Sequence, residues 1–217
     1  MAARINSAGE FIRSIAIGLL VAESGTAVAD QKPFDMIRGA RIQGVVITPQ
    51  TTFKLETTKS SLVGFGMSGR AGEEVLRKFG VPDPVFRLRE RFLSGLGKGH
   101  TGEVQLSPDA RADDDADTFK KAFGDGFVLD FRTRIWRLMY SAGKKHHRYE
   151  YWGRARLVRL ADSKVVWNET CKFLGDAPKT EGADEDVLAN DAALLRATMN
   201  MAVDHCVTEL SKRFGVQ

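Results

Sequence analysis

The clearest pattern in the chain is a set of three segments in which apolar and polar residues alternate with a period of two. They cover residues 127–140, 149–160 and 164–173. Alternation of this kind places apolar side chains on one face of a strand and polar side chains on the other. Because only short polar turns separate the segments, we expect a three-stranded antiparallel meander with one buried face.

A second pattern, with helical spacing, occupies the C-terminal end. Its apolar residues recur three, four or seven positions apart and form one stripe: Leu188, Leu195, Met199, Ala202, Cys206 and Leu210. This stripe predicts a long helix over residues 187–214. Gly215 is placed to end the helix as a C-terminal cap.

Weaker patterns precede the meander. Two strands are expected at residues 41–48 and 51–57 and three helices at 71–79, 85–96 and 117–123, whereas the polar stretch 97–116 predicts no element. These elements favour an α+β fold. In detail, we expect a two-layer sandwich in which a mainly antiparallel sheet is covered by helices, including the long C-terminal helix.

The N-terminus has the pattern of an export signal. Arg4 and Arg13 precede the apolar run 15–22, and small residues then lead to an A-x-A site at 27–29. This order is typical of a secretory signal peptide, and the apolar run is too short to cross a bilayer. We therefore expect a signal peptide at 1–29 cleaved after Ala29, a single α/β domain at 30–217, and a periplasmic location. The alternative is an amphipathic N-terminal helix.

The chain has two cysteines, and their meaning depends on the compartment. Cys171 lies on the apolar face of the third alternating segment, and Cys206 lies on the apolar stripe of the C-terminal helix. In an oxidising periplasm the two can form a disulfide between strand and helix. The alternative is two unrelated buried thiols, since cysteine packs as a small hydrophobic residue.

Composition narrows the choice of function only slightly. A 217-residue chain with 43% hydrophobic and 28% charged residues is ordinary for a globular protein and can fold without a metal. The formal net charge of +4 permits weak attraction to anionic surfaces. This positive charge is far smaller than that of a dedicated nucleic-acid-binding protein.

The meander, with its Trp167-x-x-x-Cys171 ending, and the cysteine-bearing final helix resemble uncharacterised secreted proteins and lipoproteins of the Gram-negative cell envelope. The order of strands and helices over residues 40–214 is also similar to the α/β domain at the N-terminus of TolB. The resemblance implies an adaptor or assembly role in the envelope and no catalytic residue. The chain lacks the acylated cysteine of the lipoproteins.

One surface stands out as a candidate binding face because arginines and aromatic residues alternate along two neighbouring strands. By parity, six residues share the polar side of the sheet: Arg132, Arg134, Trp136, Trp152, Arg154 and Arg156. Guanidinium groups and aromatic rings on one face can hold anionic groups and stack on bases or sugars. The alternative is a solvated outer face.

Other motifs favour structural interpretations. Gly64–Gly69 matches G-x-G-x-x-G, but residues 59–63 make a poor preceding strand, and Pro82 and Pro84 interrupt the region where the next strand should start. We therefore expect a flexible loop and no cofactor. Residues 113–117 are acidic but lack the glycine and glutamate of a calcium loop. They are expected to cap the next helix. His146 and His147 point to opposite faces of a strand, so no metal site is expected.

Three functions remain open. The first is a periplasmic, non-enzymatic adaptor or assembly factor whose partner is an envelope protein or an anionic envelope component. The second is a nucleic-acid-binding module that uses the arginine face. The third is an envelope enzyme, although no catalytic constellation is visible in the sequence.

Overall fold

A computed structural model describes residues 31–49, 52–56, 69–97, 99–141, 146–176 and 184–216. The expected signal peptide at 1–29 and most of the glycine-rich segment, residues 64–68, lie outside the described residues. The export and cleavage predictions therefore remain predictions.

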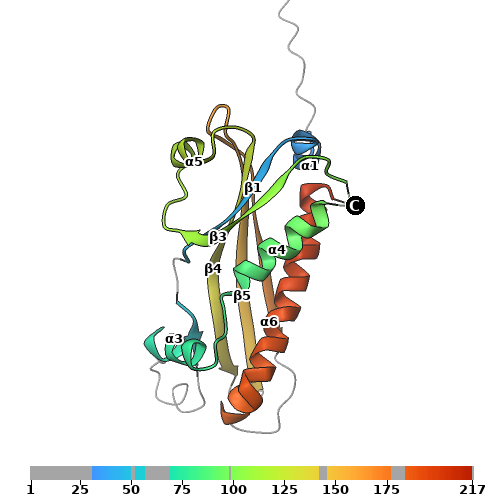
Figure 1. Cartoon of the computed structure of the whole chain (residues 1–217). Helices are drawn as coiled ribbons and strands as arrows, with labels where there is room; N and C mark the ends of the chain where they lie inside the picture. The colour runs from blue at the N-terminus through green and yellow to red at the C-terminus, as the bar shows by residue number, and fades with distance from the viewer. Residues whose placement is uncertain are drawn as a thin grey trace, which may run out of the picture. The chain divides into compact units, whose positions relative to one another are not determined.

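Within the described ranges, six strands form one open, mixed sheet (Figure 1). Their bounds are β1 Ile42–Ile47, β2 Lys54–Leu55, β3 Val104–Arg111, β4 Phe127–Ser141, β5 His146–Arg159 and β6 Lys164–Asp176. The order is β3-β1-β4-β5-β6, and β2 pairs with β4 beyond the end of β1. β1 runs parallel to both β3 and β4, whereas β4, β5 and β6 pair antiparallel.

The mixed α+β class and the mostly antiparallel sheet are confirmed, and β4, β5 and β6 are the expected meander. The expectation that residues 97–116 contain no element is wrong, because β3 lies within them. β3 is an edge strand with mostly exposed side chains and a proline, Pro108. Because most of its side chains are exposed, apolar and polar residues do not alternate along it. The sequence therefore carries no strand pattern there.

In the part of the chain that the structure describes, five helices accompany the sheet. They are α1 Pro33–Ile37, α3 Gly69–Lys78, α4 Pro84–Leu96, α5 Ala116–Phe123 and α6 Asp184–Phe214. All were expected except α1. α6 ends at Gly215, whose φ is +93° and whose amide donates to Ser211, which confirms the cap.

α4 and α6 pack side by side against one side of the sheet, here called the α4–α6 face (Figure 1). The main core lies beneath them and includes Leu88 and Phe92 of α4, Leu129 and Phe131 of β4, and five buried residues of the predicted stripe. The stripe residues are Leu195, Met199, Ala202, Cys206 and Leu210. A Cβ on Gly44 of β1 would lie 2.2 Å from Leu93 Cδ1, so α4 approaches the sheet closely there.

The other side of the sheet is here called the α5 face. A smaller core lies on it, in which Phe119 of α5 packs on Val45, Ile47, Val128 and Val158. The strand residues of this core alternate with those beneath α4 and α6, as the period of two requires. Helices therefore contact both sides of the sheet.

A β-bulge interrupts β4 between Thr133 and Ile135. Two residues of β4 then oppose one residue of β5, so side chains after the bulge point to the opposite face from the one that simple alternation predicts. This single inserted residue changes the composition of both faces.

Candidate functional site

Three of the six predicted face residues lie together on the α5 face. Arg132 of β4 is directly opposite Arg154 of β5, and Arg156 follows two residues along β5. Their side chains are only 7%, 11% and 13% exposed. Like charges at such cross-strand positions repel one another, so this cluster requires nearby carboxylates.

Asp130 supplies the first carboxylate. It lies on the same face of β4 and is fully buried, with Oδ1 2.7 Å from Arg154 Nη2 and Oδ2 2.6 Å from Arg156 Nε. Burial raises the pKa of Asp130, and the charges of Arg156 and Arg154 oppose that rise. Both of its oxygens are used in binding arginine.

Asp114 supplies the second carboxylate from the loop that precedes α5. Its Oδ2 lies 3.1 Å from Arg154 Nη2, 3.2 Å from Arg132 Nη1 and 3.9 Å from Arg156 Nη2. Partial burial alone would raise the pKa of Asp114, but the hydrogen bond from Arg154 and the charges of the arginines outweigh it. The pKa of Asp114 therefore lies below its usual value. Arg156 also donates to the Asp114 carbonyl oxygen.

These contacts form an internal ion-pair network of three guanidinium groups and two carboxylates. The loop also caps α5, because Asp115 Oδ2 accepts from the Thr118 amide at 2.9 Å, as the capping interpretation expected. Asp114 was missed because a loop residue has no periodic signal. Asp130 had a detectable signal, since it shares the parity of Arg132 on β4.

The other predicted face residues are divided between the two sides of the sheet. The prediction that Trp136 shares the polar face is wrong: it is 4% exposed and belongs to the core beneath α4 and α6. The bulge at Thr133–Ile135 reverses its direction. Arg134 lies at the bulge and is exposed. Burial lowers the pKa of Arg132, and the charge of Arg134 adds a smaller contribution in the same direction. Trp152 remains on the α5 face.

Beyond the ion-pair network, the α5 face has a partly exposed surface that we call the Trp152 surface. It consists of two cross-strand rows, Ile135–Trp152–Lys172 and Arg137–Glu150–Leu174. Lys172 Nζ lies 4.3 Å from the Trp152 ring centroid, and Arg137 pairs with Glu150. Leu174 is 54% exposed, the largest exposure among the large hydrophobic residues that the structure describes.

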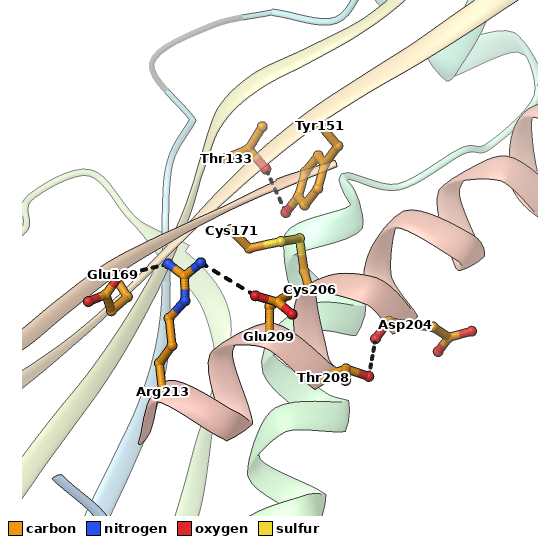
Figure 2. Close-up of a disulfide and its surroundings, with 9 residues drawn as sticks. All are labelled: Thr133, Tyr151, Glu169, Cys171, Asp204, Cys206, Thr208, Glu209 and Arg213. Atoms are coloured by element: carbon orange, nitrogen blue, oxygen red, sulfur yellow. Dashed lines mark hydrogen bonds and ion pairs between the residues drawn. A yellow bond between two sulfur atoms is a disulfide. The ribbon is translucent and has the colours of Figure 1, made fainter. Parts of the chain in front are cut away.

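Cys171 and Cys206 form a disulfide between β6 and α6, with their Cα atoms 5.3 Å apart (Figure 2). Both residues are buried in the main core, at 1% and 0% exposure. Nearby, Arg213 of α6 bridges Glu169 of β6 at 2.9 Å and Glu209 at 3.4 Å. The disulfide thus fixes the long helix to the edge strand of the sheet.

One cavity of the fold lies where the neighbour of β4 changes. β1 pairs with β4 as far as Arg132, and β2 begins to pair at Arg137. Opposite this gap lies a cavity of about 350 Å³, lined in part by Phe53, Glu73, Asp83 and Trp136. Asp83 caps α4 by accepting from the Val85 amide at 2.9 Å.

Among the residues that the structure describes, no group of three or more histidine, cysteine, aspartate or glutamate side chains is arranged to hold a metal. In the same residues, no helix is both long and apolar enough to cross a membrane.

No family model matches this chain, and no curated protein matches it. Several solved structures are similar in part. A DUF330 protein from Xanthomonas campestris has a TM-score of 0.44 at 14% identity, covering 82% of this chain and 88% of its own. The PelC dodecamer of Paraburkholderia phytofirmans has a TM-score of 0.42 at 10% identity, covering 87% and 93%. Lipoprotein GNA1162 of Neisseria meningitidis has a TM-score of 0.33 at 12% identity, covering 80% and 99%. The similarity to the TolB domain stays a prediction.

Proposed function

We propose that this protein is exported to the periplasm, where it acts as a non-enzymatic adaptor or assembly factor through contacts with another envelope protein. The observation that carries the proposal is the buried Cys171–Cys206 disulfide. Disulfides persist in oxidising compartments and are rare in the cytosol. The bond therefore agrees with the signal-like N-terminus, a separate feature of the sequence.

The arginine network argues against the nucleic-acid alternative. Phosphate binding requires guanidinium groups that a backbone can reach, whereas Arg132, Arg154 and Arg156 are largely buried and contact Asp114 and Asp130. In this arrangement the network holds the α5 loop against the sheet, so its role is structural.

The Trp152 surface is our proposed contact region. Its apolar residues, Ile135, Trp152 and Leu174, are bordered by positive charge at Lys172 and Arg134. Aromatic residues and arginine are enriched at protein interfaces, where apolar anchors lie inside a polar rim. We therefore expect a partner protein with acidic residues around an apolar contact.

The first test is the intact mass of the protein recovered from the periplasm of an expressing Gram-negative cell, with and without reductant. We expect a chain that begins at Asp30 and is two hydrogens lighter before reduction. A full-length, fully reduced protein confined to the cytosol would contradict the proposal.

The second test locates the contact. A photo-crosslinking residue at Leu174 should give a discrete adduct with one envelope protein in the native host. The same substitution at Leu106 or Met201, which are 47% and 49% exposed on β3 and α6, should not. Lys172→Glu should weaken the Leu174 adduct. Equal adducts at all three positions would exclude the Trp152 surface as the specific contact.

A further inference from the structure

The cavity beside Trp136 has a distinctive charge. Two carboxylic acids line it, Glu73 from α3 and Asp83 at the start of α4, and no lysine or arginine is among its described lining residues. Its apolar lining includes Phe53 and Trp136, whose ring centroids are 4.8 Å apart. Carboxylates and aromatic rings both attract a cation, so this lining favours one.

Asp83 binds neighbouring protein groups through one carboxylate oxygen, Oδ1. Two donors of the described part of the chain, the Val85 amide and the Thr133 hydroxyl, bind its Oδ1, at 2.9 and 2.5 Å. A ligand in the cavity would donate to the other oxygen of this carboxylate, Oδ2. Burial also raises the pKa of Asp83, and a bound cation would offset that cost by stabilising the carboxylate.

A smaller cavity of about 170 Å³ provides a contrast. It shares Thr52 and Trp136 with the larger cavity but is lined by Lys54 and Arg137. The two cavities therefore share Trp136 but are lined by side chains of opposite charge. A cation is attracted to the larger cavity and repelled from the smaller one, so the position of a cationic ligand is defined.

We propose that the cavity formed by Phe53, Glu73, Asp83 and Trp136 binds a small organic cation, an alkylammonium or guanidinium group on a short apolar stem. Its volume of about 350 Å³ lies at the lower end of ordinary ligand pockets, about 300–1,000 Å³. The cation is held by Asp83 and Glu73, and the stem lies against the apolar lining. This inference does not rest on the proposed adaptor role.

Calorimetric titration of the full chain tests the proposal with three probes of the same length: n-butylammonium, n-butanol and butyrate. We expect saturable binding of n-butylammonium only. Asp83→Asn should weaken it roughly ten- to hundred-fold, the range for a hydrogen bond to a charged group. The variant keeps an acceptor for Val85 and Thr133, and asparagine is as good a helix cap as aspartate, so it should fold.

The matched control lies next to the site. Glu73→Gln should weaken binding, whereas Glu74→Gln, the adjacent exposed residue of α3, should leave it unchanged. Stronger binding of Nα-acetyl-lysine methylamide than of n-butylammonium would identify a lysine side chain as the source of the cation, and the reverse would identify a free amine. Equal binding of n-butanol, equal effects at Glu73 and Glu74, or no saturable binding would overturn the proposal.

Discussion

Asp114 Oδ2 lies 3.1 Å from Arg154 Nη2, so a loop residue before α5 contacts the middle of β5 forty positions away. This contact closes the ion-pair network over the sheet. It also converts an arginine-rich strand pair, which the sequence suggested as a binding face, into part of the protein interior.

Asp114→Asn removes this carboxylate with little change of shape. We expect the free energy of unfolding to fall by about 1 kcal/mol at pH 7, a modest value because Asp114 is 30% exposed. Urea unfolding measures it, with the exposed Asp109→Asn as the control. Because the pKa of Asp114 is lowered in the folded state, its contribution is present above its unfolded pKa near 4 and is lost as pH falls below that value. A difference between variant and wild type that persists unchanged at pH 2–3 would contradict this account.

Asp130→Asn should be more damaging. It leaves Arg154 and Arg156 without their buried counter-charge, and breaking a buried pair costs about 3–5 kcal/mol. Chemical unfolding at pH 7 checks the value against Asp114→Asn. A smaller loss for Asp130→Asn than for Asp114→Asn would show that the partly exposed carboxylate of Asp114 dominates the network.

Asp83→Asn tests a carboxylate whose pKa burial raises. In the wild type the folded state holds its proton to a higher pH than the unfolded state does, so stability is lost as pH rises from about 4 through the folded pKa. Asparagine does not titrate. The stability of the variant relative to wild type should therefore improve between pH 4 and pH 7 in urea unfolding experiments. A constant difference over that range would mean that the environment of Asp83 does not disfavour its charge.

Reduction of the Cys171–Cys206 bond should lower the free energy of unfolding by about 3–4 kcal/mol. The bond closes a loop between residues 35 positions apart, and the chain-entropy model gives this magnitude. Guanidinium unfolding with and without reductant measures the change. The double variant Cys171→Ala, Cys206→Ala is the control, because reductant should have no effect on it.

Gly44→Ala should destabilise the fold by about 1–3 kcal/mol, since the added methyl group would overlap Leu93 of α4. Gly95→Ala in the same helix is a matched control: its Cβ meets no heavy atom within 4 Å, and helix propensity favours alanine by about 1 kcal/mol. Thermal and urea unfolding of both variants should show a loss of stability for Gly44→Ala and no loss for Gly95→Ala. Leu93→Ala should reduce the cost of Gly44→Ala, and an unchanged cost would show that the clash is not with Leu93.

Several features were readable in the sequence because they depend on local periodicity. The alternation over residues 127–173 identified the meander, and the stripe through Leu195 and Cys206 identified the inner side of α6. Burial of apolar side chains imposes a period of two on strands and of 3.6 on helices, so the pattern survives without tertiary information. The inward orientation of the Cys171 and Cys206 side chains follows from the same rule.

Tertiary structure alone decided what became of the candidate binding face. The bulge at Thr133–Ile135 turned Trp136 into the core, and the loop before α5 brought Asp114 onto Arg132 and Arg154. Neither event has a periodic signature, because a bulge is one inserted residue and a loop contact joins positions distant in the chain. The sequence by itself determined which side chains would be buried along each regular element. The long-range pairing of strands, loop and helices decided which charges meet, since electrostatic contacts depend on distance in space.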